Sequence, residues 1–203
     1  MKIIDKDDNR MIDLPGVGPC PRPVDIDERV TGFKTLKSLR IYRFQPGATI
    51  EGESENDEVF VVPVTGRVSL AVSGAHPVTA EVSPEGPARA LYMTPDHAYR
   101  LTPGAETLVA YSRAAAEGRV PCQQVEAAES SGLAEKLAFR VVDLTAGEML
   151  PLGGVKETLC SVVEGQGRFG ERALSSGQTV ALAQGETAEI TAGPALRLLI
   201  VTA

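Results

Sequence analysis

The chain contains an internal repeat, and this repeat constrains the fold more than any other feature. The segment LRIYRFQPG, which begins at Leu39, aligns with FRVVDLTAG, which begins at Phe139. The aligned residues are Arg40 with Arg140, Gly47 with Gly147, Glu58 with Glu157, and Gly66 with Gly165. The last two pairs require the omission of one residue. Two copies of one structural unit are therefore expected in a chain of 203 residues.

The repeated unit has the pattern of short β-strands joined by turns. Val59–Val64 is a nearly continuous apolar run, which is typical of a strand buried on both faces, whereas Arg67–Val72 alternates. The 20 glycines and 14 prolines suit many turns between strands, as in a β-sandwich or barrel. The predicted strands are 2–4, 39–44, 59–64, 67–72, 78–82, 89–93, 97–101 and 107–112, and the strand pattern resumes from 139 to 201.

The chain divides into four segments by composition. Residues 1–36 are rich in proline and predict an irregular arm that wraps over a domain or a partner subunit. Residues 37–113 form the first β-unit. Residues 114–136 predict a linker, in which 133–137 could make a helical turn. Residues 137–203 form the second, degenerate unit.

The composition excludes several classes of function. The formal net charge is −7, so the chain lacks the basic surface of a nucleic-acid-binding protein. No apolar run approaches the ~18 residues of a membrane span, and the opening residues MKIIDKDDNR do not resemble a signal peptide. The three cysteines lack metal-ligand spacing, and we expect reduced thiols in a cytoplasmic protein. No phosphate-binding loop or nucleophile elbow is present, so the sequence predicts no bound cofactor.

The repeated residues resemble the motifs of cupins, which are small jelly-roll barrels. The first cupin motif orders a glycine, a His-x-His pair, a glutamate and a second glycine. Both halves of the chain keep its frame, as Gly47, Glu58 and Gly66 and as Gly147, Glu157 and Gly165. At the histidine of the second motif, the two halves have Arg100 and Ala188. The resemblance implies an all-β fold of two tandem cupin barrels, a bicupin.

More narrowly, Gly32–Arg113 is similar to the N-terminal half of the 5-deoxy-glucuronate isomerase family, whose members are bicupins of inositol catabolism. The similarity lies in FKTLKSLRIYRFQPGATI, EVFVVPVTGRVSL, ARALYMTPDHAYRL and ETLVAYSRA. The end of the family's second half, which carries its metal ligands, is poorly matched. The resemblance implies a sugar acid as the ligand class and carbohydrate isomerisation as one candidate activity.

The histidines that hold the cupin metal are missing from both repeats. The chain has two histidines, His76 and His97, and both lie in the first half. The places before Glu58 and Glu157 where His-x-His would lie contain no histidine. Transition metals need several nitrogen or carboxylate donors that converge on one point. We therefore expect no metal in either barrel. The alternative is a hard ion such as Mg²⁺ or Ca²⁺ in the first barrel, held by Glu51 or Glu53 with Glu58 and His97.

Instead of a metal site, the first repeat offers residues that suit an anionic ligand. An arginine inside a barrel must be paired, either with a carboxylate of the protein or with a bound anion. Strand alternation places His97 and Tyr99 on one face and Arg100 on the other, and the sequence leaves open which face points inward. The residues expected to bind the ligand are Glu58, Arg89, Tyr92, His97, Tyr99 and Arg100.

Two classes of function stay open. In the first, the chain is a non-catalytic bicupin that binds a small anion, such as a sugar acid, in its first barrel. In the second, it is an isomerase-like enzyme that moves protons with Glu58, His97 and tyrosines, without a metal. We also expect a homodimer, because the proline-rich arm and the open sheet edges need to be covered.

Overall fold

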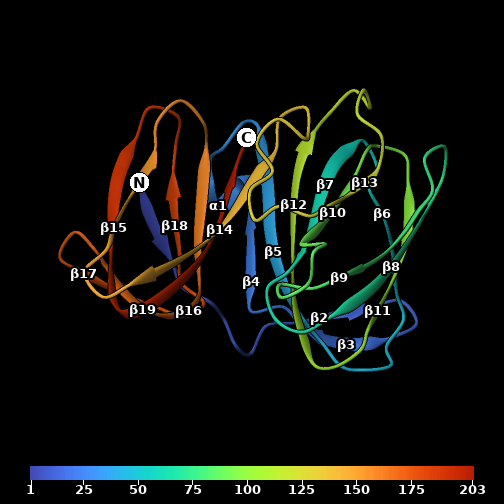
Figure 1. The fold of residues 1–203 in the computed structure, drawn as a ribbon, viewed down its shortest axis with the longest axis horizontal. Coiled ribbons are helices and arrows are strands. Elements are labelled where there is room, and N and C mark those ends of the chain that lie inside the picture. The colour runs from blue at the N-terminus through green and yellow to red at the C-terminus, as the bar shows by residue number, and fades with distance from the viewer.

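The computed structural model describes all residues 1–203, and nearly all of its regular structure is β-strand. Two barrels lie side by side, with most strands of the first half on the right of Figure 1 and those of the second half, together with the N-terminal strand, on the left. The all-β, two-barrel architecture predicted from the sequence is therefore confirmed. The single helix, α1 (Glu28–Thr31), begins at Asp27, whose side chain accepts hydrogen bonds from two backbone N–H groups of the helix.

The first barrel consists of a six-stranded sheet and a four-stranded sheet. The larger sheet contains, in spatial order, β13 (Gln123–Val125), β10 (Ala90–Met93), β7 (Asp57–Pro63), β12 (Thr107–Ala115), β5 (Leu36–Phe44) and β4 (Val24–Asp27). The smaller sheet contains β6 (Ile50–Glu53), β11 (Ala98–Pro103), β8 (Val68–Ser73) and β9 (Val78–Val82). All pairings between these strands are antiparallel.

The second barrel is one seven-stranded sheet that curves around its own core. Its strands are β1 (Lys2–Ile4), β14 (Ala138–Thr145), β15 (Met149–Gly153), β16 (Thr158–Phe169), β17 (Arg172–Ser175), β18 (Thr179–Leu182) and β19 (Thr187–Thr202). The two longest strands, β16 and β19, pair along most of their length, with register shifts after Val162 and Gly165. Such bulges bend a strand and increase its twist, which lets one sheet enclose a core.

The N-terminal segment 1–36 is not irregular, which corrects the prediction made from its prolines. Strand β1 pairs with β18 of the second barrel, and β4 extends the larger sheet of the first barrel. Between them, β2 (Met11–Leu14) and β3 (Gly18–Pro21) form a separate hairpin. A two-stranded hairpin leaves one side of each strand unpaired, so Pro19 and Pro21 remove no ladder hydrogen bond that the fold needs. Segment 1–36 therefore contributes strands to both barrels. The barrel limits expected at 37–113 and 137–203 stay a prediction.

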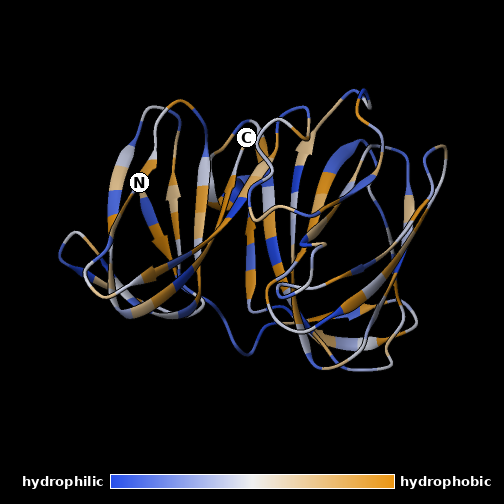
Figure 2. Ribbon diagram, in the orientation of Figure 1, coloured by the Kyte–Doolittle hydropathy of each residue, from blue (hydrophilic) through white to orange (hydrophobic).

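Three apolar cores hold the molecule together. One lies inside the first barrel and includes Val61, Leu70 and Leu101, and another lies inside the second barrel and includes Cys160 and Leu198. The third, which we call the interface core, lies between the barrels and draws residues from both halves of the chain. Figure 2 shows apolar residues recurring along the strands of both barrels and along those that run between them.

Strand β7 shows why its sequence is almost continuously apolar. Val59 and Val61 point into the first barrel, whereas Phe60 and Val62 point into the interface core. Phe60 meets Phe139 of the second barrel edge to face, with ring centroids 5.0 Å apart. Burial of a side chain of this size contributes about 2 kcal/mol. The strand is therefore buried on both faces, as its pattern predicts.

Candidate functional site

Glu58, the carboxylate shared with the cupin motif, points out of the first barrel and into the interface core. It is fully buried and accepts hydrogen bonds from the backbone N–H groups of Glu135, Lys136 and Leu137, at 2.6 to 2.8 Å. Residues 133–137 form no helix, so the helical turn that the sequence allowed there is wrong. Glu58 fastens the linker rather than lining a cavity.

Glu157, which aligns with Glu58 in the repeat, makes the equivalent contact from the second barrel to the first. Its carboxylate accepts hydrogen bonds from the backbone N–H groups of Lys34, Thr35 and Leu36. Each glutamate therefore binds the segment that leads into the first long strand of the other barrel. We call this pair of contacts the reciprocal clamp. The aligned glutamates of the repeat are thus explained by a contact between the barrels.

Tyr92 belongs to the clamp. It is fully buried, and its hydroxyl donates to Glu58 Oε2 at 3.0 Å. Burial, together with the neighbouring Glu58 charge, raises the pKa of Tyr92, so the hydroxyl stays protonated and remains a donor.

His97 is buried, and both of its ring nitrogens are occupied. Nε2 accepts a hydrogen bond from the backbone N–H of His76 at 3.0 Å, and Nδ1 lies 2.7 Å from the carbonyl oxygen of Pro95. A nitrogen that faces a carbonyl must carry the proton, so this geometry requires the neutral Nδ1–H tautomer. His97 therefore joins two loops and has no free lone pair for a ligand.

The structure shows which face of the strand that carries Tyr99 and Arg100 points into the barrel, a question that the sequence left open. Tyr99 packs against the core inside the first barrel, and a Cβ on the facing Gly52 would lie 2.6 Å from its hydroxyl oxygen. Arg100 points outward and pairs with Glu51 on the surface, at 2.7 Å. Both partners are 65% exposed, and such pairs contribute about 0–1 kcal/mol.

The six residues expected to form one site are consequently divided among separate places. Glu58 and Tyr92 lie in the interface core, His97 lies between loops, and Arg100 lies on the outer surface. Arg89 lines a small cavity between the barrels. The structure pairs Glu58 with Tyr92 and places Tyr99 and Arg100 on one open hollow, but it does not gather all six residues around a common ligand.

A different group of charged residues lies at one end of the first barrel. On the inner face of its larger sheet, Arg40 of β5 stands directly between Asp25 of β4 and Tyr111 of β12. In the next row of residues on this inner face, Ser38 stands between Asp27 and Arg113. Cross-strand neighbours of this kind have side chains close enough to act together.

These rows border an open hollow of about 400 Å³, which we call the barrel mouth. No apolar side chain lines it. Its lining residues are Asp27, Glu28, Arg29, Lys37, Ser38, Arg40, Glu55, Asp57 and Arg113. Three of its cations are paired: Arg29 with Asp27, Lys37 with Asp57, and Arg113 with Glu55 and Asp57.

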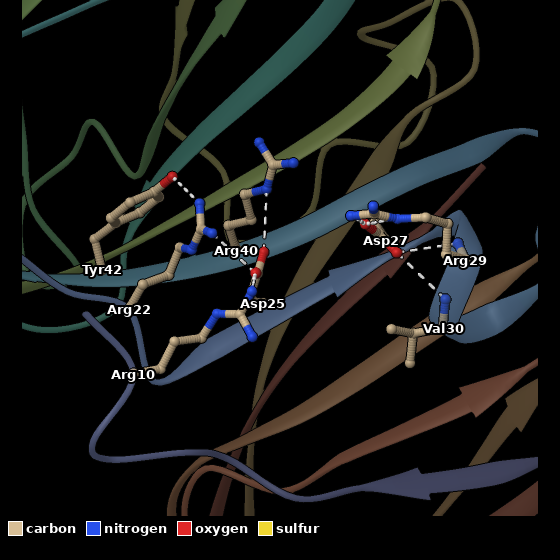
Figure 3. Close-up of polar contacts among 8 residues, drawn as sticks. All are labelled: Arg10, Arg22, Asp25, Asp27, Arg29, Val30, Arg40 and Tyr42. Atoms are coloured by element: carbon tan, nitrogen blue, oxygen red, sulfur yellow. Dashed lines mark hydrogen bonds and ion pairs between the residues drawn. The ribbon is translucent and has the colours of Figure 1, made fainter. Parts of the chain in front are cut away.

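Arg40 is balanced less completely than the other cations of the mouth. Its ion-pair partner, Asp25, also contacts Arg10 and Arg22, as Figure 3 shows. One carboxylate thus faces three guanidinium groups, so positive charge is in excess around Asp25, although the four acidic and four basic side chains that line the mouth balance one another. Arg22 also donates to the Tyr42 hydroxyl at 3.2 Å, and this contact brings no negative charge.

Two buried donors beside the barrel mouth lack a well-formed hydrogen bond. Arg40 Nε lies 3.3 Å from Asp25 Oδ1, but its geometry is not that of a hydrogen bond, and the Tyr111 hydroxyl faces Tyr99 without a hydrogen bond of good geometry. Burial raises the pKa of Tyr111 well above its usual value, so this hydroxyl stays protonated. Unpaired buried donors are uncommon in proteins and call for an explanation.

Sequence reasoning missed Arg40, Asp57, Tyr111 and Arg113 as site residues. Arg40 aligns with Arg140 in the repeat, which was a usable signal. Asp57 was overlooked because its neighbour Glu58 occupies the motif position, although a shift of one residue moves a side chain to the opposite face of the sheet.

The residues present do not fit the metal that the cupin fold implies. The interior of each barrel is lined mainly by apolar side chains, and no group of three histidine, cysteine, aspartate or glutamate residues converges anywhere in the chain. The positions of the metal-binding histidines are occupied by residues without imidazole nitrogens, and His97 uses both of its nitrogens within the protein. We therefore assign no step to a metal.

Comparison with solved structures finds the same fold in several cupin proteins. Bacterial pirin YhhW from Escherichia coli, solved with nickel(II), superposes with a TM-score of 0.71 at 14% identity, over 99% of this chain and 98% of that chain. A variant of oxalate decarboxylase from Bacillus subtilis gives 0.74 at 9% identity, over 98% and 76%. Quercetin 2,3-dioxygenase from Acinetobacter baumannii gives 0.69 at 13% identity, over 100% and 85%. These identities establish the fold alone.

Sequence comparison identifies the family. No curated protein sequence matches the chain. No helix of the structure is long and apolar enough to cross a membrane. The KduI/IolB family matches residues 21–132, which include the larger sheet and the mouth of the first barrel. Since this match covers more than half of the sequence, the chain is a member of the KduI/IolB family, built on the two-barrel cupin fold.

Proposed function

We propose that the chain binds a sugar acid at the barrel mouth, with the ligand carboxylate on Arg40. The observation that carries the proposal is the charge balance at Asp25, where one carboxylate meets three arginines. A carboxylate bound to Arg40 would offset the excess positive charge and would pair with a guanidinium through charge-assisted hydrogen bonds.

The remaining lining suits the rest of a sugar. Ser38, Glu55 and Asp57 offer oxygen atoms that can accept hydrogen bonds from sugar hydroxyls, and Arg113 offers further N–H donors. A hollow without apolar walls would bind an aliphatic acid poorly, because it offers no surface on which to bury a hydrocarbon chain. Membership of the KduI/IolB family supports a sugar-derived ligand. The three unpaired thiols support a reducing compartment such as the cytoplasm.

Calorimetric titration with D-glucuronate tests the proposal, with glucose as the uncharged comparison. We expect glucuronate to bind, and glucose to bind far more weakly. Arg40→Gln should weaken glucuronate binding by about tenfold or more, since a hydrogen bond to a charged group contributes about 1.5–3 kcal/mol. Arg100→Gln is the matched control, because Arg100 is an exposed arginine of the same barrel with its own carboxylate partner. Equal affinity in wild type and Arg40→Gln would refute the proposal.

A second candidate function, isomerisation of the bound sugar acid, is favoured by the family match. It requires a base that moves a proton between adjacent carbons. Glu58 and His97 are buried and bonded within the protein. Glu55 is 71% exposed and lines the mouth, so a ligand can reach its carboxylate, whereas Asp57 is held by Lys37 and Arg113. Proton NMR of glucuronate with the protein in D₂O should then show exchange at the carbon beside the carbonyl. A spectrum that stays unchanged at stoichiometric protein would eliminate this candidate and leave binding alone.

A further inference from the structure

We propose that the cavity between the two barrels is a second ligand site, which takes a short aliphatic carboxylate. The cavity has a volume of about 100 Å³ and is lined by residues of both repeats. Strand β7 and the residue after it contribute Val62 and Val64, and the second barrel contributes Val141 and Val163. We call this cavity the seam site. It shares no residue with the barrel mouth.

Two arginines give the seam site its positive charge. Arg89 and Arg197 both line the cavity, and Asp143 is the only carboxylate among the lining residues. Asp143 pairs with Arg197 Nε at 3.4 Å and is 74% exposed. Arg89, which is half-buried, thus reaches the cavity without a carboxylate of its own. A partly buried guanidinium without a counter-charge is a favourable place for an anion.

The hydrophobic side chains that line the seam site favour an aliphatic chain as the rest of the ligand. Half of the lining residues are hydrophobic, so an aliphatic chain can be buried there. Sugar hydroxyls beside the apolar side chains would lose their hydrogen bonds to water, because the charged partners in the lining are confined to Arg89, Asp143 and Arg197. The volume of about 100 Å³ limits the ligand to a short acid, such as propionate or butyrate.

The packing around the seam site supports a ligand that touches both barrels. A smaller hollow of about 70 Å³ adjoins it and shares Val64 and Val163. The interface core is therefore incompletely filled along this line. Because a ligand there contacts both halves, it should stabilise the folded chain as a whole.

Thermal unfolding in the presence of butyrate tests this inference, with butyramide as the uncharged analogue of similar shape. We expect butyrate, but not butyramide, to raise the unfolding temperature of the wild-type chain at millimolar concentration. Arg89→Gln should remove the shift, and Val163→Phe, which fills the cavity without a change of charge, should remove it as well. Arg40→Gln should leave it intact, because Arg40 lies at the barrel mouth.

Three results would overturn the inference: no shift with butyrate in the wild type, an equal shift with butyramide, or an undiminished shift in Arg89→Gln. Titration of butyrate into the folded Arg89→Gln protein by calorimetry provides a second measurement that does not depend on the stability of the variant. Because Arg40→Gln and Arg89→Gln affect different ligands, failure at one site can be distinguished from failure at the other.

Discussion

Arg40 and Arg100 belong to the same barrel but have opposite surroundings. Arg100 is exposed and paired with a carboxylate of its own, so water screens its charge. Arg40 is partly buried and shares one carboxylate with two other arginines. The difference arises from strand parity, since Arg40 points to the inside of its sheet and Arg100 points to the outside. An arginine is a candidate for binding an anionic ligand only where it is partly buried and its charge is incompletely paired.

The cysteine thiols are expected to be unreactive in the folded protein. All three are free and buried in the barrel interiors, and burial raises the pKa of Cys160 to about 12. Because the thiolate is the reactive form, Ellman's reagent should react slowly with the native chain and rapidly with three thiols after denaturation. A thiol that reacts quickly at neutral pH in the native protein would contradict this burial.

Asp27 should contribute to the dependence of stability on pH. Its side-chain hydrogen bond from Arg29 is the chief reason that its pKa lies below the usual value of 3.8. A carboxyl with a lowered pKa stabilises the fold above that usual value and loses this contribution as the pH falls further. Asp27→Asn should therefore be less stable than wild type near neutral pH, by about 1 kcal/mol or less.

Urea denaturation of both proteins from neutral to acidic pH checks this expectation. The difference in free energy of unfolding should shrink as the pH falls through the lowered pKa of Asp27. A difference that stays constant over that range would show that the Asp27 charge has no part in it.

For single residues, the sequence predicted which positions of the two repeats correspond, but it did not predict what their side chains contact. The aligned Glu58 and Glu157 proved to be structurally equivalent, but their role depends on N–H groups far along the chain. No local pattern shows which of Asp57 and Glu58 faces the barrel interior, because both are buried and alternation permits either. The charge at Asp25 depends on three arginines that only the folded chain brings together.

Among the structural elements, the reciprocal clamp offers the sharpest test. Glutamine in place of Glu58 or Glu157 would point an amide NH₂ at backbone donors and leave some of them without an acceptor. Each unsatisfied buried donor costs about 1–3 kcal/mol, so each substitution should lower the free energy of unfolding by about that amount or more. Glu164→Gln is a matched control, because Glu164 lies on β16 and is exposed.

Chemical denaturation of the two clamp variants and of the control measures these effects. The control should change stability by about 0.5 kcal/mol or less. Clamp variants as stable as the control would show that the carboxylates contribute nothing to holding the barrels together.

Prediction of the elements from sequence succeeded where a local pattern determines the outcome. Strands β1 and β9 have the limits that were expected, and the apolar run at β7 is buried throughout. Prediction failed for the rest of the N-terminal segment, residues 5–36, and for residues 133–137, whose conformations depend on partners in distant parts of the chain. Pairing of β1 with β18 across nearly the whole sequence cannot be inferred from propensity alone.

For the molecule as a whole, we expect a homodimer. The proline-rich arm pairs within the chain, and the exposed apolar side chains that a dimer would cover lie near the second barrel. Met149 on β15 is 61% exposed, and Val155 is 84% exposed. Sedimentation velocity should show a dimer at micromolar concentration, and Met149→Glu should shift it towards monomer. A wild-type monomer under these conditions would contradict the expectation.

We propose that the first barrel recognises its ligand through the arginine charge around Asp25 rather than through a metal. A crystal structure of the chain grown with D-glucuronate is the decisive measurement. We expect the ligand carboxylate within hydrogen-bond distance of the Arg40 guanidinium, with the sugar hydroxyls towards Ser38, Asp57 and Arg113. A carboxylate bound elsewhere in the barrel, or no glucuronate at the mouth at saturating concentration, would contradict it.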